Sequence, residues 1–294
     1  MKKSSSRVAF EVFNAVFMIL LCAVMLYPFI FTFSASISNS AQVAAGNVTL
    51  LPKDVNFDAY KTVLGYQKVW TAYGNTIWYT VVGTLVSLLL TICGAYPLSR
   101  SDFYGKSVFV FFITLTMIFS GGLIPTFLVV KGVGLYNSRW AIILPGALST
   151  MNMIIMRTFF QGIPDALEEA ATIDGCSDFQ ILFKIILPLS TASLMTIGMF
   201  YAVGYWNSWF SALIYLRDAD KYPLQLVLRQ IVLQNQVNDL ISQQAGTTIE
   251  DTTKMVSETV KYAVVMVATI PILCVYPFAQ KYFVKGALVG SIKG

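Results

Sequence analysis

A charged, helix-forming segment, "EEAATIDGCSDFQILFKIILP" at residues 168–188, holds the residue types in this chain that are best suited to polar chemistry. Pro164, just before it, can occupy the first position of a helix. Asp165, Glu168 and Glu169 then lie in the opening turns, where the helix dipole favours anions. Carboxylates presented in this way can form charge-assisted contacts with a basic surface. The chemistry expected here is recognition.

The same segment predicts two short helices with a corner between them. Gly175 ends the first helix, and residues 178–184 can start a second one before Leu187 and Pro188 turn the chain away. If the backbone at Gly175 has a positive φ, larger residues would resist that conformation. We therefore expect a small amphipathic elbow over residues 163–188.

Several sequence signals of catalysis or metal binding are absent from the sequence. It contains no histidine, which removes imidazole bases, Ser-His triads and the commonest zinc ligand. Its four cysteines have no paired spacing, and the stretch "GALVGSIKG" lacks the Gly-Lys-Ser/Thr ending of a phosphate-binding loop. We therefore expect no catalytic residue, no metal and no cofactor bound by this chain.

Composition places the chain in a membrane. Of its 294 residues, 56% are hydrophobic and only 12% are charged, too few to cover a soluble surface. The net charge of +5 is explained by lysines and arginines that flank the membrane. Nucleic-acid binding is not indicated, since no basic run with interleaved aromatics lies outside the apolar segments. The sequence therefore predicts an all-α polytopic membrane protein without a nucleic-acid partner.

The apolar segments predict six transmembrane helices, each long enough to cross a hydrocarbon core of about 30 Å. The first is retained, since a cleaved signal peptide would have a shorter apolar core. Gly121, Gly122 and Pro125 predict a kink in the third. We see no internal repeat and expect one permease domain over 1–294. The predicted spans are 9–33, 76–98, 108–130, 140–157, 190–216 and 262–281.

Basic residues favour an N-terminus inside the cell. The raw count of Lys and Arg is equal on the two sides, but those assigned outside are spread mainly over two long loops, 34–70 and 217–257, which influence orientation less. This choice makes 163–188 a cytoplasmic loop and 217–257 an extracellular one. In the latter, "LQLVLRQIVLQNQVNDL" predicts a helix, followed by a tip around 243–248.

The segment 163–188 resembles the EAA loop that couples ABC importer permeases to their ATPase. The residues that match this pattern and its spacing are Glu169, Ala170, Ala171, Asp174, Gly175, Ile185, Leu187 and Pro188. The resemblance implies the type I ABC importer permease fold. It also implies that Glu169 faces a basic residue of the ATPase. On the residues alone, an ordinary amphipathic loop at the membrane interface remains the alternative.

Two further stretches, "YWNSWFSALIYLRD" and "KYFVKGALVGSIKG", resemble the carbohydrate-uptake branch of that family, in particular the smaller permease subunit of the maltose transporter. The resemblance implies a second homologous permease, a cytoplasmic ABC ATPase dimer that holds ATP and Mg, and an extracellular solute-binding protein. It also implies that the tail 284–294 enters between the ATPase subunits. An unstructured tail is the alternative. The tail residues concerned are Gly286, Gly290, Lys293 and Gly294.

Polar and aromatic residues within the spans are candidate sugar contacts, because aromatic faces stack on sugar rings and amides bond hydroxyl groups. An aromatic belt at the membrane interface explains the same residues equally simply. The candidates are Asn152, Tyr201, Tyr205, Trp206, Asn207 and Trp209.

An ion-coupled secondary transporter of a small polar solute is the alternative function. Such transporters usually carry ionisable residues at mid-membrane, and spans two to six here are almost free of them. Backbone carbonyls can also hold sodium, so both readings stay open on the residues alone. The function expected is the permease of an ATP-driven carbohydrate importer in the bacterial cell membrane, with both termini cytoplasmic.

Overall fold

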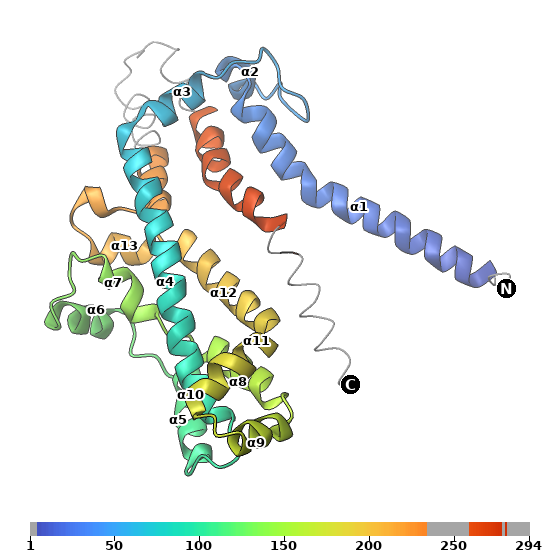
Figure 1. Cartoon of the computed structure of the whole chain (residues 1–294). Coiled ribbons are helices and arrows are strands. Elements are labelled where there is room, and N and C mark those ends of the chain that lie inside the picture. The colour runs from blue at the N-terminus through green and yellow to red at the C-terminus, as the bar shows by residue number, and fades with distance from the viewer. Residues whose placement is uncertain (1–4, 234–258, 278–279, 281–294) are drawn as a thin grey trace. The chain divides into compact units, whose positions relative to one another are not determined.

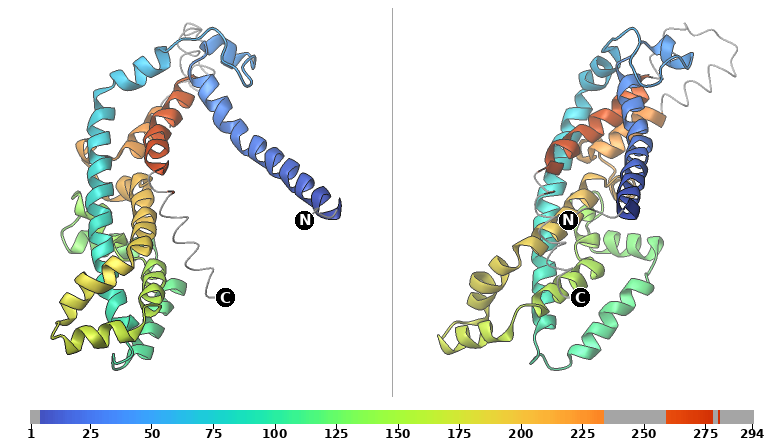
Figure 2. Two further views of the ribbon diagram at one scale, coloured as in Figure 1. Left: turned by 45° about the vertical axis from the view of Figure 1, so that its right-hand side comes forward. Right: turned by 90° about the vertical axis from the view of Figure 1, so that its right-hand side faces the viewer.

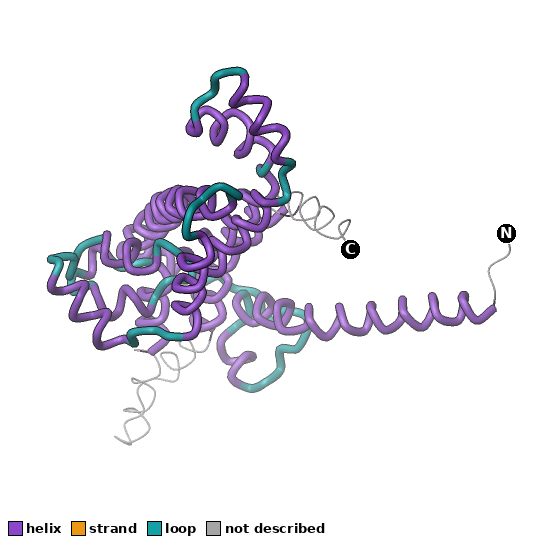
Figure 3. Tube along the Cα trace, turned by 90° about the horizontal axis from the view of Figure 1, so that it is seen from below, coloured by secondary structure: helices purple, strands orange, loops and turns teal. Residues whose placement is uncertain are grey.

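All regular structure in the described part of the chain is helical. The computed structural model describes residues 5–233, 259–277 and 280, and the views in Figure 1 and Figure 3 show helices joined by loops there. The chain divides into two compact units, one made of Met1–Val69 with Leu228–Pro271 and the other of Trp70–Val227 with Ile272–Gly294. The prediction of a single permease domain over 1–294 stays a prediction.

The first unit contains a long apolar helix and a hydrogen-bonded loop. Its helices are α1 (Ser5–Ser36), α2 (Ser40–Ala44) and α3 (Asp58–Gly65). Ser34 donates to the carbonyl of Leu50 at 2.6 Å, and the hydroxyls of Ser36 and Tyr60 are 2.8 Å apart. These bonds tie the loop after α1 to the end of the helix.

The second unit is built around α4 (Gln67–Ser99), the long helix in Figure 1 that begins just before the unit. Helices broken in the middle of an apolar stretch follow it. The further elements are α5 (Lys106–Ile118), α6 (Leu123–Gly132), α7 (Trp140–Ile143), η1 (Leu144–Gly146), α8 (Thr150–Gln161), α9 (Asp165–Ile173), α10 (Asp178–Ile181), η2 (Leu182–Ile186), α11 (Leu187–Leu189), α12 (Thr191–Trp206), α13 (Phe210–Tyr215) and η3 (Ala219–Lys221).

The described residues contain three helices long and apolar enough to cross a membrane, or up to six candidate spans if each bent pair counts as one. Three are single helices, Arg7–Ser36, Gln67–Ser99 and Thr259–Pro277. The other three are bent pairs: Lys106–Ile118 with Leu123–Gly132 at 113°, Trp140–Gly146 with Thr150–Gln161 at 55°, and Asp178–Leu189 with Thr191–Trp206 at 83°. The predicted all-α membrane fold is confirmed, with more strongly bent spans than the apolar pattern indicated.

The kink predicted in the third span lies at residues 119–122. Gly122 precedes α6 with a φ of 81°, a conformation that residues with a Cβ rarely adopt. Pro125, which was also expected to mark the kink, lies inside the first turn of α6, where its missing N–H has no helical partner to lose. The glycine therefore sets the position of this break.

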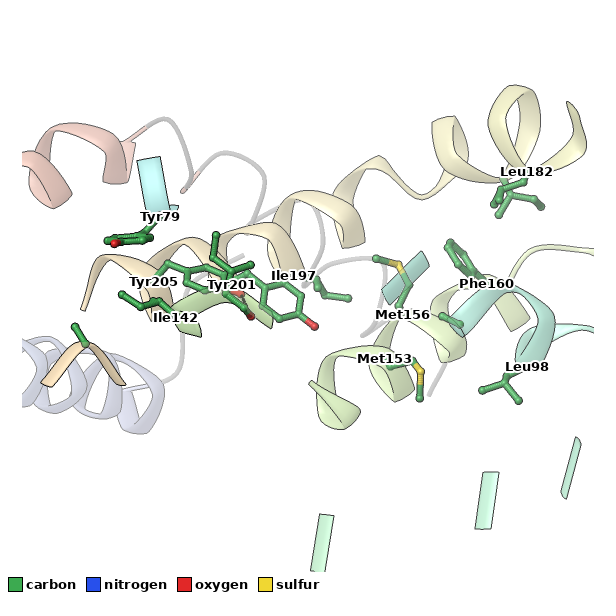
Figure 4. Close-up of a cluster of buried hydrophobic side chains, with 14 of the residues drawn as sticks. Tyr79, Leu98, Ile142, Met153, Met156, Phe160, Leu182, Ile197, Tyr201 and Tyr205 are labelled. Carbon is green, nitrogen blue, oxygen red and sulfur yellow. Dashed lines mark hydrogen bonds between the residues drawn. The ribbon is translucent and has the colours of Figure 1, made fainter. Parts of the chain in front are cut away.

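The core of the second unit joins α4, α8 and α12. Figure 4 shows its aromatic and aliphatic side chains, among them Tyr79, Phe160 and Ile197, none of which is exposed. Lipid tails are as apolar as these side chains, so close packing and internal polar bonds hold the helices together.

Two tyrosines provide such bonds. The hydroxyl of Tyr201 lies 2.7 Å from that of Thr91 and accepts a bond from the Ser149 N–H at 3.1 Å. The hydroxyl of Tyr205 lies 2.9 Å from that of Ser87 and donates to the carbonyl of Ile143 at 3.3 Å. In a membrane, backbone polar groups freed at a break need internal partners. These tyrosines therefore support the broken fourth span against α4.

Candidate functional site

The first short helix of the predicted elbow is α9, and it begins one residue later than expected. Pro164 has an extended backbone at the cap position, and Asp165 and Glu168 lie in the first turn. The sequence reasoning placed Pro164 inside the helix. The difference leaves the carboxylates in the same opening turn, where the helix dipole favours them.

Gly175 forms the corner that ends α9. Its φ is 79°, its N–H donates to the carbonyl of Thr172 at 3.0 Å, and the N–H of Cys176 donates to the carbonyl of Ala171 at 3.0 Å. This pair of bonds is the Schellman arrangement, which requires a left-handed residue after the helix. A Cβ at position 175 would meet no atom within 4 Å, so backbone conformation, not space, calls for glycine.

The second short helix, α10, starts at a capping box that the sequence reasoning missed. The Ser177 N–H donates to the Gln180 side-chain oxygen at 2.9 Å, and the Ser177 side chain caps the third residue of the helix in return. A Ser followed three residues later by Gln is a recognisable start signal. The predicted helix within 178–184 is therefore present, although only Asp178–Ile181 is α-helical.

A π-helical segment, η2, connects α10 to α11. Pro188 cannot donate to the carbonyl of Lys184 and its ring would crowd that carbonyl in a regular helix, so the wider turn before it relieves the conflict. At Ser190 the chain bends by 83° into α12. Ile185 and Leu187, the predicted motif residues here, pack partly buried against the core of the second unit.

Adjacent carboxylates on α9 face different surroundings. Glu168 is 16% exposed and forms an ion pair with Arg100, which is 14% exposed and follows the last residue of α4. Glu169 is exposed, as are Ala170 and Asp174, whereas Ala171 is buried in the core. The structure therefore presents Glu169 to solvent and uses Glu168 internally, a distinction that the sequence reasoning did not make.

Arg100 is held by several groups at once. Its guanidinium lies 4.9 Å from the ring centre of Tyr96, and it donates to Ser99 Oγ at 3.0 Å and to the Phe160 carbonyl at 3.5 Å. Burial lowers the pKa of Arg100 from its ordinary value, partly offset by nearby groups that include Asp165. An arginine remains charged at neutral pH despite such a shift.

Two other cations bind the end of α4. Arg157 from α8 donates to the Leu98 carbonyl at 2.8 Å, and Lys106 at the start of α5 donates to the Arg100 carbonyl at 2.8 Å and to that of Ser99 at 3.3 Å. The last carbonyls of a helix lack internal partners and carry the negative end of its dipole, so both contacts are favourable.

A cleft of about 1190 Å³ lies between α9, α10 and the end of α4, three elements that stand close together in both views of Figure 2. Its lining includes the carboxylates of Asp102, Asp165, Glu169 and Asp178. Within the described residues none of these four forms a salt bridge, so the cleft carries unneutralised negative charge.

Large apolar side chains at this cleft are exposed. Tyr104 is 97% exposed, Ile173 86% and Phe179 76%. Exposed apolar residues beside free carboxylates are suited to a partner surface that is basic and partly apolar. The described residues hold no group of three or more Cys, Asp or Glu side chains that could bind a metal ion.

The candidate sugar contacts differ in burial and in their partners. Tyr201 and Tyr205 are buried, with their hydroxyls bonded inside the chain as described above. Asn207 follows α12 and donates to the Val203 carbonyl at 3.0 Å. Trp206 and Trp209 are partly buried, and Asn152 is buried in α8. Tyr201 and Tyr205 thus have a structural role in the chain.

The start of the predicted loop 217–257 is held by a polar network. Asn137, with a φ of 59°, accepts from the N–H groups of Arg217 and Asp218 and donates to the Asp218 carboxylate at 2.9 Å. Lys221 donates to that carboxylate at 2.8 Å. The helix predicted to follow is present at Leu224–Leu233. The predicted tip 243–248 and tail 284–294 lie outside the described residues.

The sequence is similar to those of known transport proteins. Residues 87–288 match the family "Binding-protein-dependent transport system inner membrane component". The chain is 44% identical to the polygalacturonan/rhamnogalacturonan transport system permease protein YtcP of Bacillus subtilis over 95% of this chain and 96% of that protein. It is 42% identical to Protein LplC of the same organism, over 97% and 95% of the two chains.

A solved structure shares both the fold and much of the sequence. The crystal structure of a bacterial ABC transporter involved in the import of the acidic polysaccharide alginate matches with a TM-score of 0.85 and 41% identity, over 96% of this chain and 99% of that chain. The family expected from the pattern at 169–188 is thereby confirmed. This chain belongs to the binding-protein-dependent transport system inner membrane components, as the non-catalytic permease subunit of an ABC importer.

Proposed function

We propose that this permease imports an oligosaccharide derived from an acidic polysaccharide. The observation that carries the proposal is the similarity, at 41% identity over nearly the whole of both chains, to a transporter of the acidic polysaccharide alginate. YtcP, a permease of a polygalacturonan/rhamnogalacturonan transport system, is similar at 44% identity, and polygalacturonan is a polymer of uronic acids. A carbohydrate substrate also agrees with the expectation from the sequence, and the ion-coupled alternative has no support in these relatives.

The experiment is substrate-stimulated ATP hydrolysis by the reconstituted transporter. We expect oligogalacturonides or alginate oligosaccharides, presented with the binding protein, to stimulate hydrolysis, whereas maltotriose and arabinotriose leave it unchanged. If only the neutral sugars stimulated hydrolysis, the acidic substrate would be wrong and only carbohydrate import would stand. Uptake driven by an ion gradient without ATP would overturn it.

The partners proposed are a second homologous permease, a cytoplasmic ATPase dimer that binds ATP and Mg, and an extracellular binding protein. The exposed surface of 163–188, with Glu169 at an acidic cleft and a glycine corner at Gly175, supports docking of an ATPase. Insertion of the tail 284–294 between the ATPase subunits belongs to the same proposal. So does sugar contact by Asn152, Tyr201, Tyr205, Trp206, Asn207 and Trp209, while similarity to the smaller maltose permease stays a prediction.

The topology proposed places both termini and residues 163–188 in the cytoplasm of a bacterial cell. Cys176 in this loop offers a direct test, since the other cysteines, Cys22, Cys93 and Cys274, can be replaced by alanine. An impermeant maleimide should leave Cys176 unlabelled in intact cells and label it in inverted vesicles. The reverse pattern would overturn the orientation.

A further inference from the structure

The carboxylate that precedes the coupling motif is turned inward. Successive residues of an α-helix point about 100° apart, so Glu168 and Glu169 leave α9 in different directions. Glu169 is exposed at the cleft, whereas Glu168 meets Arg100, and both members of that pair are at most 16% exposed. A pair shielded to this extent is screened less by salt than a surface pair.

Arg100 is a fixed partner. The Tyr96 ring at 4.9 Å, Ser99 Oγ at 3.0 Å and the Phe160 carbonyl at 3.5 Å constrain the guanidinium on the sides that Glu168 leaves open. The ring of Tyr96 in turn packs edge-on against that of Phe160, with centroids 6.3 Å apart. Phe160 is completely buried, so the bond to its carbonyl anchors Arg100 to the core of the second unit.

The end of α4 that carries Arg100 is itself tied to its neighbours. Arg157 of α8 binds the Leu98 carbonyl, and Lys106 of α5 binds the Arg100 carbonyl, each at 2.8 Å. A displacement of α9 therefore reaches α4, α5 and α8 through charged and hydrogen-bonded groups. Besides the ion pair, α9 contributes Ala171 to the buried core of the second unit.

We propose that the Arg100–Glu168 pair is a brace that makes the coupling helix α9 move as one body with the end of α4, with Arg100 as a positioning residue. The proposal rests on the proposed ATPase coupling of this loop. It adds a contact inside the permease, next to the motif residue Glu169, that would pass ATPase motion to the second span.

The first test measures the brace in the chain itself. Spin labels on Cys93 and on Ile173→Cys, with the remaining cysteines replaced, report the distance between α4 and α9. We expect a narrow distribution in the otherwise unchanged protein and a broad one in Arg100→Gln and in Glu168→Gln. Lys184→Gln, which removes an exposed cation from the same loop, is the matched control and should stay narrow. Equal widths in all variants would overturn the brace.

The second test measures coupling in the assembled transporter. In both single variants, oligogalacturonide uptake per ATP hydrolysed should fall roughly 2- to 30-fold, the range for residues that modulate coupling between sites. The double variant should fall no further, because one interaction is lost in each case. Arg100→Lys should recover part of the coupling, since it keeps the charge but not the fork of donors.

The two failures are distinguishable. The pair would be merely structural if the variants had lower melting temperatures, with additive losses of stability in the double variant, but unchanged uptake per ATP. That result would overturn the brace. If the unchanged chain captures no ATPase, the proposed function fails, while the spin-label distances still decide whether the brace exists.

Discussion

The two ends of the second unit differ in how they treat their polar groups. At the Asn137 end, side-chain amides, backbone carbonyls and the Asp218–Lys221 pair bond to one another, and Asn75 donates to the Asp220 carbonyl at 2.7 Å. At the coupling end, four carboxylates without a salt bridge among the described residues line an open cleft beside exposed Tyr104 and Ile173. One end is bonded internally, and the other leaves charges and apolar side chains for a partner.

This difference distinguishes a part that holds the fold together from a part that is available to a partner. The Asn137 end and the tyrosine bonds to α4 hold broken helices in place, so substitutions there should mainly lower stability. The coupling end is held by the Schellman corner, the capping box and Arg100, while its outer face makes few internal contacts. Substitutions there should mainly lower the uptake per ATP hydrolysed, in a chain that remains folded.

The largest effect is expected at the corner of the coupling loop. Gly175→Val should lower transport and ATPase capture by roughly 5- to 30-fold, because a left-handed backbone costs an L-residue about 1–2 kcal/mol. Gly175→Asn is the matched control, since Asn tolerates this conformation better. The measurements are uptake by proteoliposomes and ATPase co-purification. Normal values for Gly175→Val would contradict the role of the corner.

A smaller effect, on stability, is expected where α4 meets α12. A Cβ at position 83 would lie 2.7 Å from the Tyr205 ring, so Gly83→Ala should destabilise the chain by about 1–3 kcal/mol through overpacking. Gly94→Ala should cost less, because its nearest neighbour is the flexible side chain of Met153. Gly204→Ala meets no atom within 4 Å and serves as the control. Thermal unfolding in detergent measures all three, and equal melting temperatures for Gly83→Ala and Gly204→Ala would refute the close contact.

The smallest effect is expected at Asp218. Hydrogen bonds from Lys221 and Asn137 lower the pKa of this carboxyl below its ordinary value of 3.8. Its folded pKa is depressed, so its contribution is present at pH values above 3.8 and is lost as pH falls through the folded pKa. Amide exchange at residues 216–222, expressed relative to the intrinsic chemical rate at each pH, should therefore rise slightly in strongly acidic solution.

In Asp218→Asn the same exchange should be slightly raised at neutral pH and lose this acid dependence. An unchanged acid dependence in Asp218→Asn would assign the titration to another group. Because Asp218 is exposed, we expect no measurable change in transport at neutral pH.

The family and the coupling loop could be predicted because their signals are local. Apolar length predicts a span wherever it lies, and Gly175 ends α9 through the residues immediately around it. The same locality explains why Ser177 and Gln180 could have been recognised as a capping box before the structure was known. Backbone conformation over a few residues depends mainly on those residues.

The bends in the spans were harder to predict. An apolar pattern shows that a segment can cross the membrane, but not that 190–216 would contain a bend at Ser190 and a break after Trp206. Breaks are tolerated only where other groups satisfy the freed backbone. At the fourth span those groups are Tyr201 and Tyr205, which lie far along the chain on α12.

The sequence by itself determined that this is a membrane protein with an amphipathic elbow and a glycine corner, since composition and short-range turn chemistry suffice for both. That it is a permease followed from the resemblance of residues 169–188 to the ABC importer family. Only the tertiary structure decided which polar residues serve the chain internally. Glu168 and Glu169 are adjacent residues of one type, and Tyr201 and Tyr205 are two aromatic residues on one helix that remain predicted sugar contacts. Their internal contacts are made with Arg100, Thr91 and Ser87, which folding brings to them from distant positions in the chain.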